Sequence, residues 1–163
     1  MSDAATTPRP PLRQVSGPAL GAAQLHALLR LRCDVFVVEQ ECPYAEVDGR
    51  DLLPTTTHLW VEDEVGGVAA TLRLLDADGP GSQLVVGRVV TAPEARGRGL
   101  AARLVEQVVA EHGGERSLFL EAQSHLVGWY ARFGFVRDGE DFDLDGIPHA
   151  PMVRPAGRVG AAD

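Results

Sequence analysis

The chain has 163 residues, 45% of them hydrophobic, which predicts one globular domain with a sizeable core rather than a disordered chain. A formal net charge of −8 argues against general nucleic-acid binding, and the longest apolar runs are too short for a membrane span. The chain contains no lysine, which excludes a phosphate-binding P-loop and a pyridoxal Schiff base.

The first third of the chain predicts a tail, a strand, a helix and a long loop. Residues 1–11 are rich in Ala, Thr and Pro and predict a loose N-terminal tail, followed by a short strand at 12–16. A helix is expected from Pro18 to Gln40, because proline suits a first helical position and apolar residues recur at three- and four-residue steps. Pro43 is predicted to end this helix. The loop at 42–57 is long enough to suggest a functional role.

The rest of the chain predicts strands interrupted by two helices. Residues 57–63 and 67–75 predict an antiparallel hairpin, and 82–92 predicts a third strand in which Gly87 suggests a bulge. Residues 99–114 predict an amphipathic helix, because two apolar rows recur at four-residue steps. The remaining segments predict a strand at 117–123, a short helix at 124–133 and strand pieces at 135–138 and 149–154. This order indicates an α/β (α+β) fold with a mixed sheet in one domain, 12–155, and a C-terminal tail at 156–163.

The turn "RGRGLA" at residues 96–101 joins a strand to the amphipathic helix. A helix N-terminus presents unpaired N–H groups and a partial positive charge. Gly97 and Gly99 leave the backbone accessible, while Arg96, Arg98 and Arg103 add positive potential. The turn therefore predicts a pyrophosphate site. Its glycine spacing and its place after a hairpin do not fit a dinucleotide-binding fold.

The turn resembles the R/Q-x-x-G-x-G/A signature of the GNAT acetyltransferases, which binds the pyrophosphate of acetyl-coenzyme A (acetyl-CoA). Two more segments are similar to that family: "VGRVVTAPEA" to its fourth strand, and "GWYARFGF" to its second signature. The segments "LLRLRCDVFVVEQECPYAEVDGRDL" and "DGIPHAPM" resemble the ElaA-type branch. The resemblance implies a mainly antiparallel central sheet flanked by helices. It also implies cofactor contacts from Val89, Val90, Thr91, Arg96, Gly97, Arg98, Gly99, Leu100, Ala101 and Gln123, the last of which stands where many members carry asparagine.

The resemblance implies an N-acetyltransferase that transfers an acetyl group from acetyl-CoA directly to a primary amine. The acidic character of the chain favours an amine that is cationic. It places Tyr130 at the thiol as a general acid, and a bulge near Gly87 could free a backbone N–H for the carbonyl. Arg88 occupies the position where some members carry a catalytic glutamate. Glu121 and Glu39 are candidate bases, with His58, His125, His149 and a chain of waters as further alternatives. An autoinducer-synthase-like acyltransferase and a non-enzymatic acyl-CoA sensor are the alternative functions.

Acidic residues gather in two segments. Five lie at the front, Glu39, Glu41, Glu46, Asp48 and Asp51, and four near the end, Glu140, Asp141, Asp143 and Asp145. They are interpreted either as solvated surface or as an acidic rim that attracts a cationic amine. "DFDLDG" does not predict a calcium loop, because Met152 stands where a bidentate glutamate is required. No metal site, nucleic-acid partner or membrane contact is expected. Two cysteines without an export signal predict a cytoplasmic protein. The acceptor is expected to be a small-molecule or peptide amine, and the sequence leaves the oligomeric state open.

Overall fold

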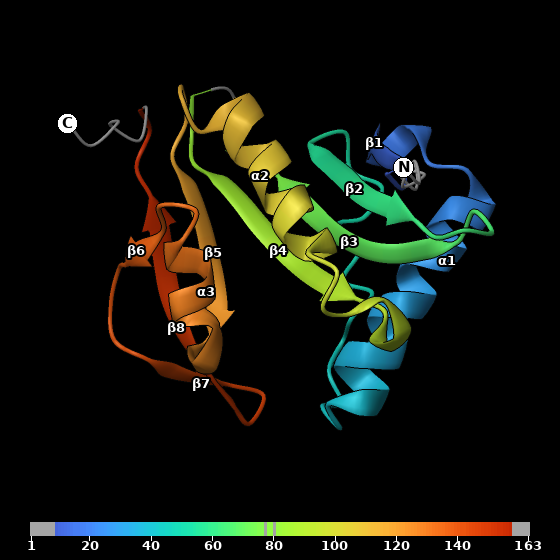
Figure 1. The fold of residues 1–163 in the computed structure, drawn as a ribbon. Helices are drawn as coiled ribbons and strands as arrows, with labels where there is room; N and C mark the ends of the chain where they lie inside the picture. The colour runs from blue at the N-terminus through green and yellow to red at the C-terminus, as the bar shows by residue number, and fades with distance from the viewer. Residues whose placement is uncertain (1–8, 77, 80, 158–163) are drawn as a thin grey trace, which may run out of the picture.

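One mixed sheet forms the centre of the molecule. The computed structural model describes residues 9–157 except 77 and 80. Within this part, eight strands form a sheet in the order β1-β2-β3-β4-β5-β8-β6, with β7 paired to β8 (Figure 1). Their bounds are β1 Leu12–Ser16, β2 Thr56–Glu62, β3 Val68–Leu75, β4 Leu84–Thr91, β5 Leu118–Gln123, β6 Val136–Arg137, β7 Phe142–Leu144 and β8 Ile147–Arg154. Among the described strands, only the β4–β5 pair is parallel. The predicted mixed, mainly antiparallel sheet is confirmed.

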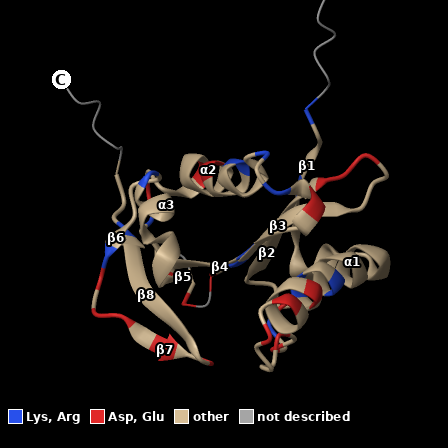
Figure 2. Ribbon diagram, turned by 60° about the horizontal axis from the view of Figure 1, so that its bottom comes forward, with Lys and Arg blue, Asp and Glu red and all other residues tan. Residues whose placement is uncertain are grey.

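Helices cover both faces of the sheet. The α-helices are α1 Ala22–Arg32, α2 Leu100–His112 and α3 Val127–Ala131, and the short or irregular turns are η1 Gly17–Ala19, η2 Cys33–Glu39, η3 Pro93–Ala95 and η4 Ser124–Leu126. Helices α2 and α3 lie on one face and α1 on the other (Figure 2). The amphipathic helix predicted at 99–114 is confirmed as α2, which buries Leu100, Leu104, Val105 and Val108 against the sheet. No helix in the described ranges is long and apolar enough to cross a membrane.

The front helix differs from its prediction at both ends. Pro18 lies in the short turn η1, and α1 begins only at Ala22, where the Gln24 side chain accepts a hydrogen bond from the Gly21 N–H at 3.0 Å. From Cys33 to Glu39 the helix continues as a π-helix. It ends before Pro43, because Glu41 adopts a φ of +52° and reverses the chain. Single-turn π segments are frequent at functional sites. This one leads directly into the long loop between η2 and β2, residues 40–55, which we call the front loop.

Two further predictions need correction in detail. The "DFDLDG" segment contains a strand that the sequence did not predict: β7 spans Phe142–Leu144, and a tight turn at Asp145 and Gly146 joins it to β8. Most of the two predicted tails lies outside the described residues. Pro11, placed in the N-terminal tail, is nevertheless attached to the sheet, because its carbonyl accepts a hydrogen bond from the Glu62 N–H at 2.9 Å.

A buried arginine fastens the front loop to the core. The Arg32 side chain is 1% exposed and donates hydrogen bonds to Glu46 and to Asp51, the latter at 2.6 Å. Burial alone would raise the pKa of the Asp51 carboxyl group, but the hydrogen bond and charge of Arg32, with those of Arg73, hold it below its ordinary value. The Asp51 carboxylate therefore stays ionised inside the protein. A buried ion pair of this kind is costly to break from one side, because the remaining charge has no water to solvate it.

Two more arginines complete this arginine–carboxylate network, which consists of Arg32, Arg73, Arg88, Glu46, Asp48 and Asp51. Arg73 on β3 donates to Asp48 at 2.7 Å and to Asp51 at 3.1 Å. Arg88 on β4 contacts Glu46 at 2.8 Å and Asp48 at 3.4 Å. Three cations thus balance three anions. Both interpretations of the front acidic residues are wrong for Glu46 and Asp51, which are buried against these arginines, whereas Asp48 is an exposed residue paired with Arg73 and Arg88.

We expect the substitution Arg32→Met to lower the free energy of unfolding by about 3–5 kcal/mol, since it leaves Glu46 and Asp51 buried without their shared cation. The matched control is Arg30→Met. Arg30 is 75% exposed and lies 3.7 Å from Asp34 on the helix surface, so its loss should change stability by less than about 1 kcal/mol. Urea denaturation of both variants at pH 7 measures the difference. Equal losses in the two variants would contradict the structural role assigned to Arg32.

Candidate active site

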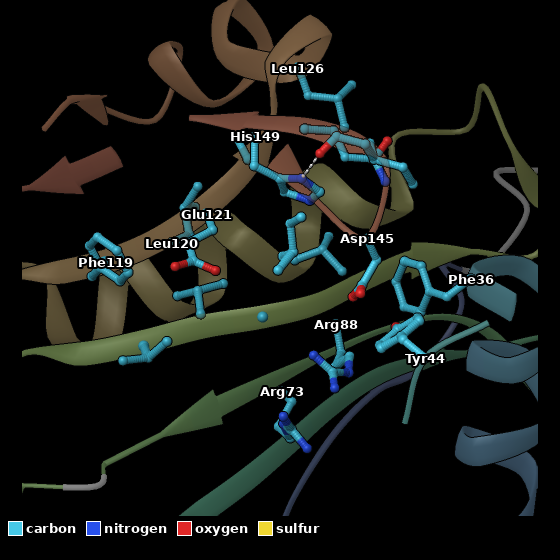
Figure 3. Close-up of a pocket in the computed structure, with 18 of the residues that line it drawn as sticks. Phe36, Tyr44, Arg73, Arg88, Phe119, Leu120, Glu121, Leu126, Asp145 and His149 are labelled. Carbon is cyan, nitrogen blue, oxygen red and sulfur yellow. Dashed lines mark hydrogen bonds between the residues drawn. The ribbon is translucent and has the colours of Figure 1, made fainter. Parts of the chain in front are cut away.

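A cavity of about 430 Å³ lies between β4 and β5. The two strands pair only at Leu84 with Leu118 and at Val85 with Phe119. Beyond these positions they diverge, and side chains from η2, the front loop, β3, β8 and α3 line the space between them (Figure 3). The divergence therefore creates a site whose two walls come from different halves of the sheet.

A bulge shapes the β4 wall. Gly87 pairs with Arg73 and Val90 with Thr71, so two residues of β4, Arg88 and Val89, oppose one residue of β3. Arg88 has a φ of +53°, which is rare outside glycine and marks a strained position at the cavity. The predicted bulge near Gly87 is confirmed. The extra residue of a bulge is left out of the strand ladder, so backbone N–H groups here are available to a bound molecule.

The edge of β4 that faces the cavity is open beyond the bulge. Val90 and Thr91 pair with β3 on one side. On the β5 side, no described strand pairs with β4 after Val85. Val89 also lines the cavity. These three residues were predicted to contact a cofactor, and their free backbone edge could pair with an extended molecule in the manner of another strand.

The turn at residues 96–101 has the conformation expected of an anion site. Gly97 and Gly99 have φ values of +76° and +71°, and Gly99 is the N-cap of α2. A Cβ atom added to either glycine would meet no atom within 4 Å, so the space in front of the turn is open. Arg96 lies 2.8 Å from Glu39, whereas Arg103 points to the Pro10 carbonyl. Left-handed glycines, a helix N-terminus and open space together fit a pyrophosphate group.

Tyr130 lies on α3, and its residue is 7% exposed while lining the cavity. Its ring makes edge contacts with Trp129 and Phe135, at centroid distances of 4.8 Å and 6.1 Å. Burial raises the pKa of the Tyr130 hydroxyl above its ordinary value, because the phenolate would be poorly solvated. The hydroxyl therefore remains protonated at neutral pH and can donate a proton.

The structure separates the two predicted candidate bases. Glu121 is exposed on β5 and lines the cavity, because it alternates with the buried Leu120 and Ala122. Glu39 is paired with Arg96 and does not line the cavity. Gln123, predicted to contact the cofactor, lines the cavity and donates a hydrogen bond to Gln40 at 3.1 Å across it. No group of three His, Cys, Asp or Glu side chains in the described chain could hold a metal ion.

Sequence reasoning missed the arginine side of the cavity. Arg73 and Arg88 line it together with Tyr44, and the Arg88 guanidinium lies 5.5 Å from the centre of the Tyr44 ring (Figure 3). A signal was available for Arg73, which stands in the apolar run "ATLRLL", where a charged residue needs a partner. Arg32 gave the same signal by falling on the apolar stripe of its helix.

Comparisons with known proteins agree on one family. Residues 34–155 match the model of the acetyltransferase (GNAT) domain. The UPF0039 protein Rv2851c of Mycobacterium tuberculosis is 48% identical over 145 residues, which cover 88% of this chain and 92% of the relative. ElaA of Escherichia coli is 39% identical over 140 residues, which cover 83% and 90% of the two chains.

Two crystal structures show the same fold over nearly their full length. That of Escherichia coli ElaA has a TM-score of 0.82 at 34% identity, and covers 89% of this chain and 99% of its own. That of an acyl-CoA N-acyltransferase from Pseudomonas aeruginosa has a TM-score of 0.82 at 42% identity, with the same coverage of 89% and 99%. The chain therefore belongs to the GNAT acetyltransferase family, in its ElaA-type branch, and is an acyltransferase enzyme.

Proposed function

We propose that this enzyme transfers an acetyl group from acetyl-CoA to a cationic primary amine, by direct attack while both substrates are bound. The observation that carries this proposal is the cavity between the diverging strands β4 and β5, which brings the free edge of β4 and Tyr130 to one space. Both cysteines are free thiols. This agrees with a reaction in the reducing cytoplasm.

Acetyl-CoA binding is assigned to β4 and the turn that follows it. The backbone edge from Val89 to Thr91 would pair with the pantetheine arm, and the turn from Arg96 to Ala101 would hold the pyrophosphate. Gln123 borders the same space and can donate and accept hydrogen bonds. Bound acetyl-CoA supplies an activated thioester. Binding along this strand edge would cost the protein little rearrangement, because β4 has no partner on the β5 side after Val85.

Two groups of this chain act on the thioester. A backbone N–H of the bulge at Arg88 and Val89 would polarise the carbonyl, which lowers the barrier most where water is excluded. The Tyr130 hydroxyl protonates the departing sulfur. Burial raises the pKa of this hydroxyl, so it still carries its proton at neutral pH when the C–S bond breaks.

The proposal that the acceptor is cationic rests on charged side chains that line the cavity and lie outside the arginine–carboxylate network. Glu121 and Asp145 line the cavity, and neither side chain has an ion-pair partner among the described residues. Arg50 is the cavity cation that stands outside the network, so among the lining residues outside the network two carboxylates face one cation. An ammonium group is attracted to such a site. The attraction comes from β5 and the β7–β8 turn, rather than from the front loop.

The direct test measures free thiol released from acetyl-CoA in the presence of matched amines. We expect release that depends on the acceptor, with kcat/KM decreasing in the order 1,4-diaminobutane, n-butylamine, 4-aminobutanoate. The three amines differ in the charge at the end opposite the reacting amine, which is positive, neutral and negative in that order. A reaction without acceptor corrects for hydrolysis and for the enzyme's own thiols. Release that is the same with and without every amine would refute the proposed function, and a preference for 4-aminobutanoate would refute the cationic acceptor.

The variant Gly99→Asp tests the pyrophosphate site. The added Cβ meets no neighbouring atom, so the fold should survive, while the carboxylate repels the phosphates at the start of α2. We expect calorimetry to show at least a roughly tenfold loss of acetyl-CoA affinity. Gly99→Asn is the matched control, since asparagine has nearly the same shape and also tolerates this backbone conformation. Equal affinities of the two variants would show that charge at this turn is irrelevant to binding.

The variant Tyr130→Phe tests the general acid. Removing one hydroxyl preserves the ring contacts with Trp129 and Phe135. We expect kcat to fall by about 10²–10⁴-fold, the usual contribution of a positioned acid, while the acetyl-CoA affinity stays nearly constant. Stopped-flow thiol release and calorimetry separate the two quantities. An unchanged kcat would remove Tyr130 from the mechanism.

A further inference from the structure

The direct attack proposed above needs a proton acceptor, and His149 is placed for that role. His149 lies on β8 opposite Gln123 of β5, lines the cavity and is only 9% exposed. The Phe142 ring packs near its imidazole at a centroid distance of 6.0 Å. The imidazole is thus held between the β7–β8 hairpin and the cavity (Figure 3).

A hydrogen bond fixes which imidazole nitrogen is free. His149 Nδ1 lies 2.8 Å from the Ile147 carbonyl oxygen. A carbonyl oxygen can only accept, so Nδ1 carries the hydrogen, and in the neutral ring Nε2 is left with its lone pair. Nε2 has no hydrogen-bond partner in the described chain. Among the described residues, Arg73 Nε is the fully buried side-chain nitrogen or oxygen that lacks a hydrogen-bond partner. His149 Nε2 also lacks a partner but is not fully buried, so it is accessible to solvent.

We infer that His149 Nε2 is the general base that deprotonates the acceptor amine, an inference that rests on the proposed N-acetyltransferase function. The ammonium gives one proton to Nε2, which frees the nitrogen lone pair to form the N–C bond with the acyl carbon. The C–S bond breaks, and Tyr130 gives its proton to sulfur. The second amine proton restores Tyr130, and the imidazolium releases its proton to solvent, so the reaction liberates one proton in total.

The charges around the cavity suit this step. Glu121 and Asp145 are the carboxylates outside the network, and they favour both an incoming ammonium and the imidazolium that forms. The charges of Arg73, Arg88 and Asp48 are balanced within the network, which leaves Arg50 as the opposing cation. The other titratable side chains that line the cavity are Cys42, Tyr44 and Tyr130.

His149 fits the role of base better than Glu121 for two reasons. The imidazole is buried and held by a hydrogen bond, whereas Glu121 is exposed and has no hydrogen bond in the described chain that would orient it. Histidine is also the side chain that most often serves as the general base in enzymes. We therefore assign Glu121 to attraction of the amine and His149 to the proton transfer.

The test uses the variants His149→Ala and His149→Gln, with His26→Ala as control because His26 is an exposed histidine that does not line the cavity. With an amine that supports wild-type turnover, we expect kcat of both His149 variants to fall by about 10²–10⁴-fold, at an unchanged acetyl-CoA affinity. His149→Gln keeps the side chain's bulk and a donor for the Ile147 carbonyl, so it reports on the base rather than on folding. His26→Ala should match the wild type.

Added imidazole distinguishes a base from a structural residue. It should restore activity to His149→Ala, and substituted imidazoles should rescue in proportion to their basicity. Glu121→Gln should raise the acceptor KM more than it lowers kcat. Wild-type kcat in His149→Gln, or a loss that no imidazole rescues, would overturn the inference while leaving the N-acetyltransferase function intact. A wild-type enzyme that shows no acceptor-dependent thiol release would instead refute the proposed function.

A second measurement does not depend on turnover. Nitrogen-15 NMR of the histidine side chains at neutral to alkaline pH, assigned with His149→Gln, should show His149 as the Nδ1–H tautomer with an unprotonated Nε2. An Nε2–H tautomer would overturn the inference, because that nitrogen could not accept a proton from the amine.

Discussion

The divergence of β4 from β5 is the constraint on which the rest of the site depends. β4 pairs with β3 along most of its length but with β5 at only two positions. A strand edge without a partner inside a protein exposes backbone donors and acceptors, and such groups must be satisfied by water or by a ligand. The bulge at Arg88 and the turn before α2 lie on this same strand and its extension. The cavity, the bulge and the glycine turn therefore lie along one strand and its extension.

The arginine–carboxylate network gives the open cavity a fixed wall. Arg32, Arg73 and Arg88 reach the front loop from α1, β3 and β4, and each contacts at least two of its carboxylates. Because no helix or strand holds this loop between η2 and β2, the ion pairs fix it in place. Because the charges of the network neutralise one another, the residues outside the network set the net charge at the cavity.

The opposite wall carries the groups assigned to proton transfer. Tyr130 and His149 come from α3 and β8, which pack with β5 in the C-terminal half of the sheet. Two contacts join the walls across the cavity: Gln123 with Gln40, and the Cys42 thiol with the Asp145 carbonyl at 3.3 Å. The enzyme thus keeps substrate-binding backbone on β4 and proton chemistry on the C-terminal strands, and contacts near the cavity hold the two at a fixed distance.

The sequence by itself determined the features that depend on neighbours within a few residues. Apolar spacing located α2, the β2–β3 hairpin and β4, and the glycines of the 96–101 turn marked the start of α2, because each pattern reflects a local backbone conformation. The motif around Tyr130 indicated the family for the same reason. Only the tertiary structure decided which charges meet. Arg73 lies 25 residues from Asp48 and Arg88 lies 42 residues from Glu46, and local patterning does not encode partners at such separations. The same limit hid β7, whose pairing is with β8, and the orientation of His149, which depends on the hydrogen bond that the β7–β8 hairpin provides.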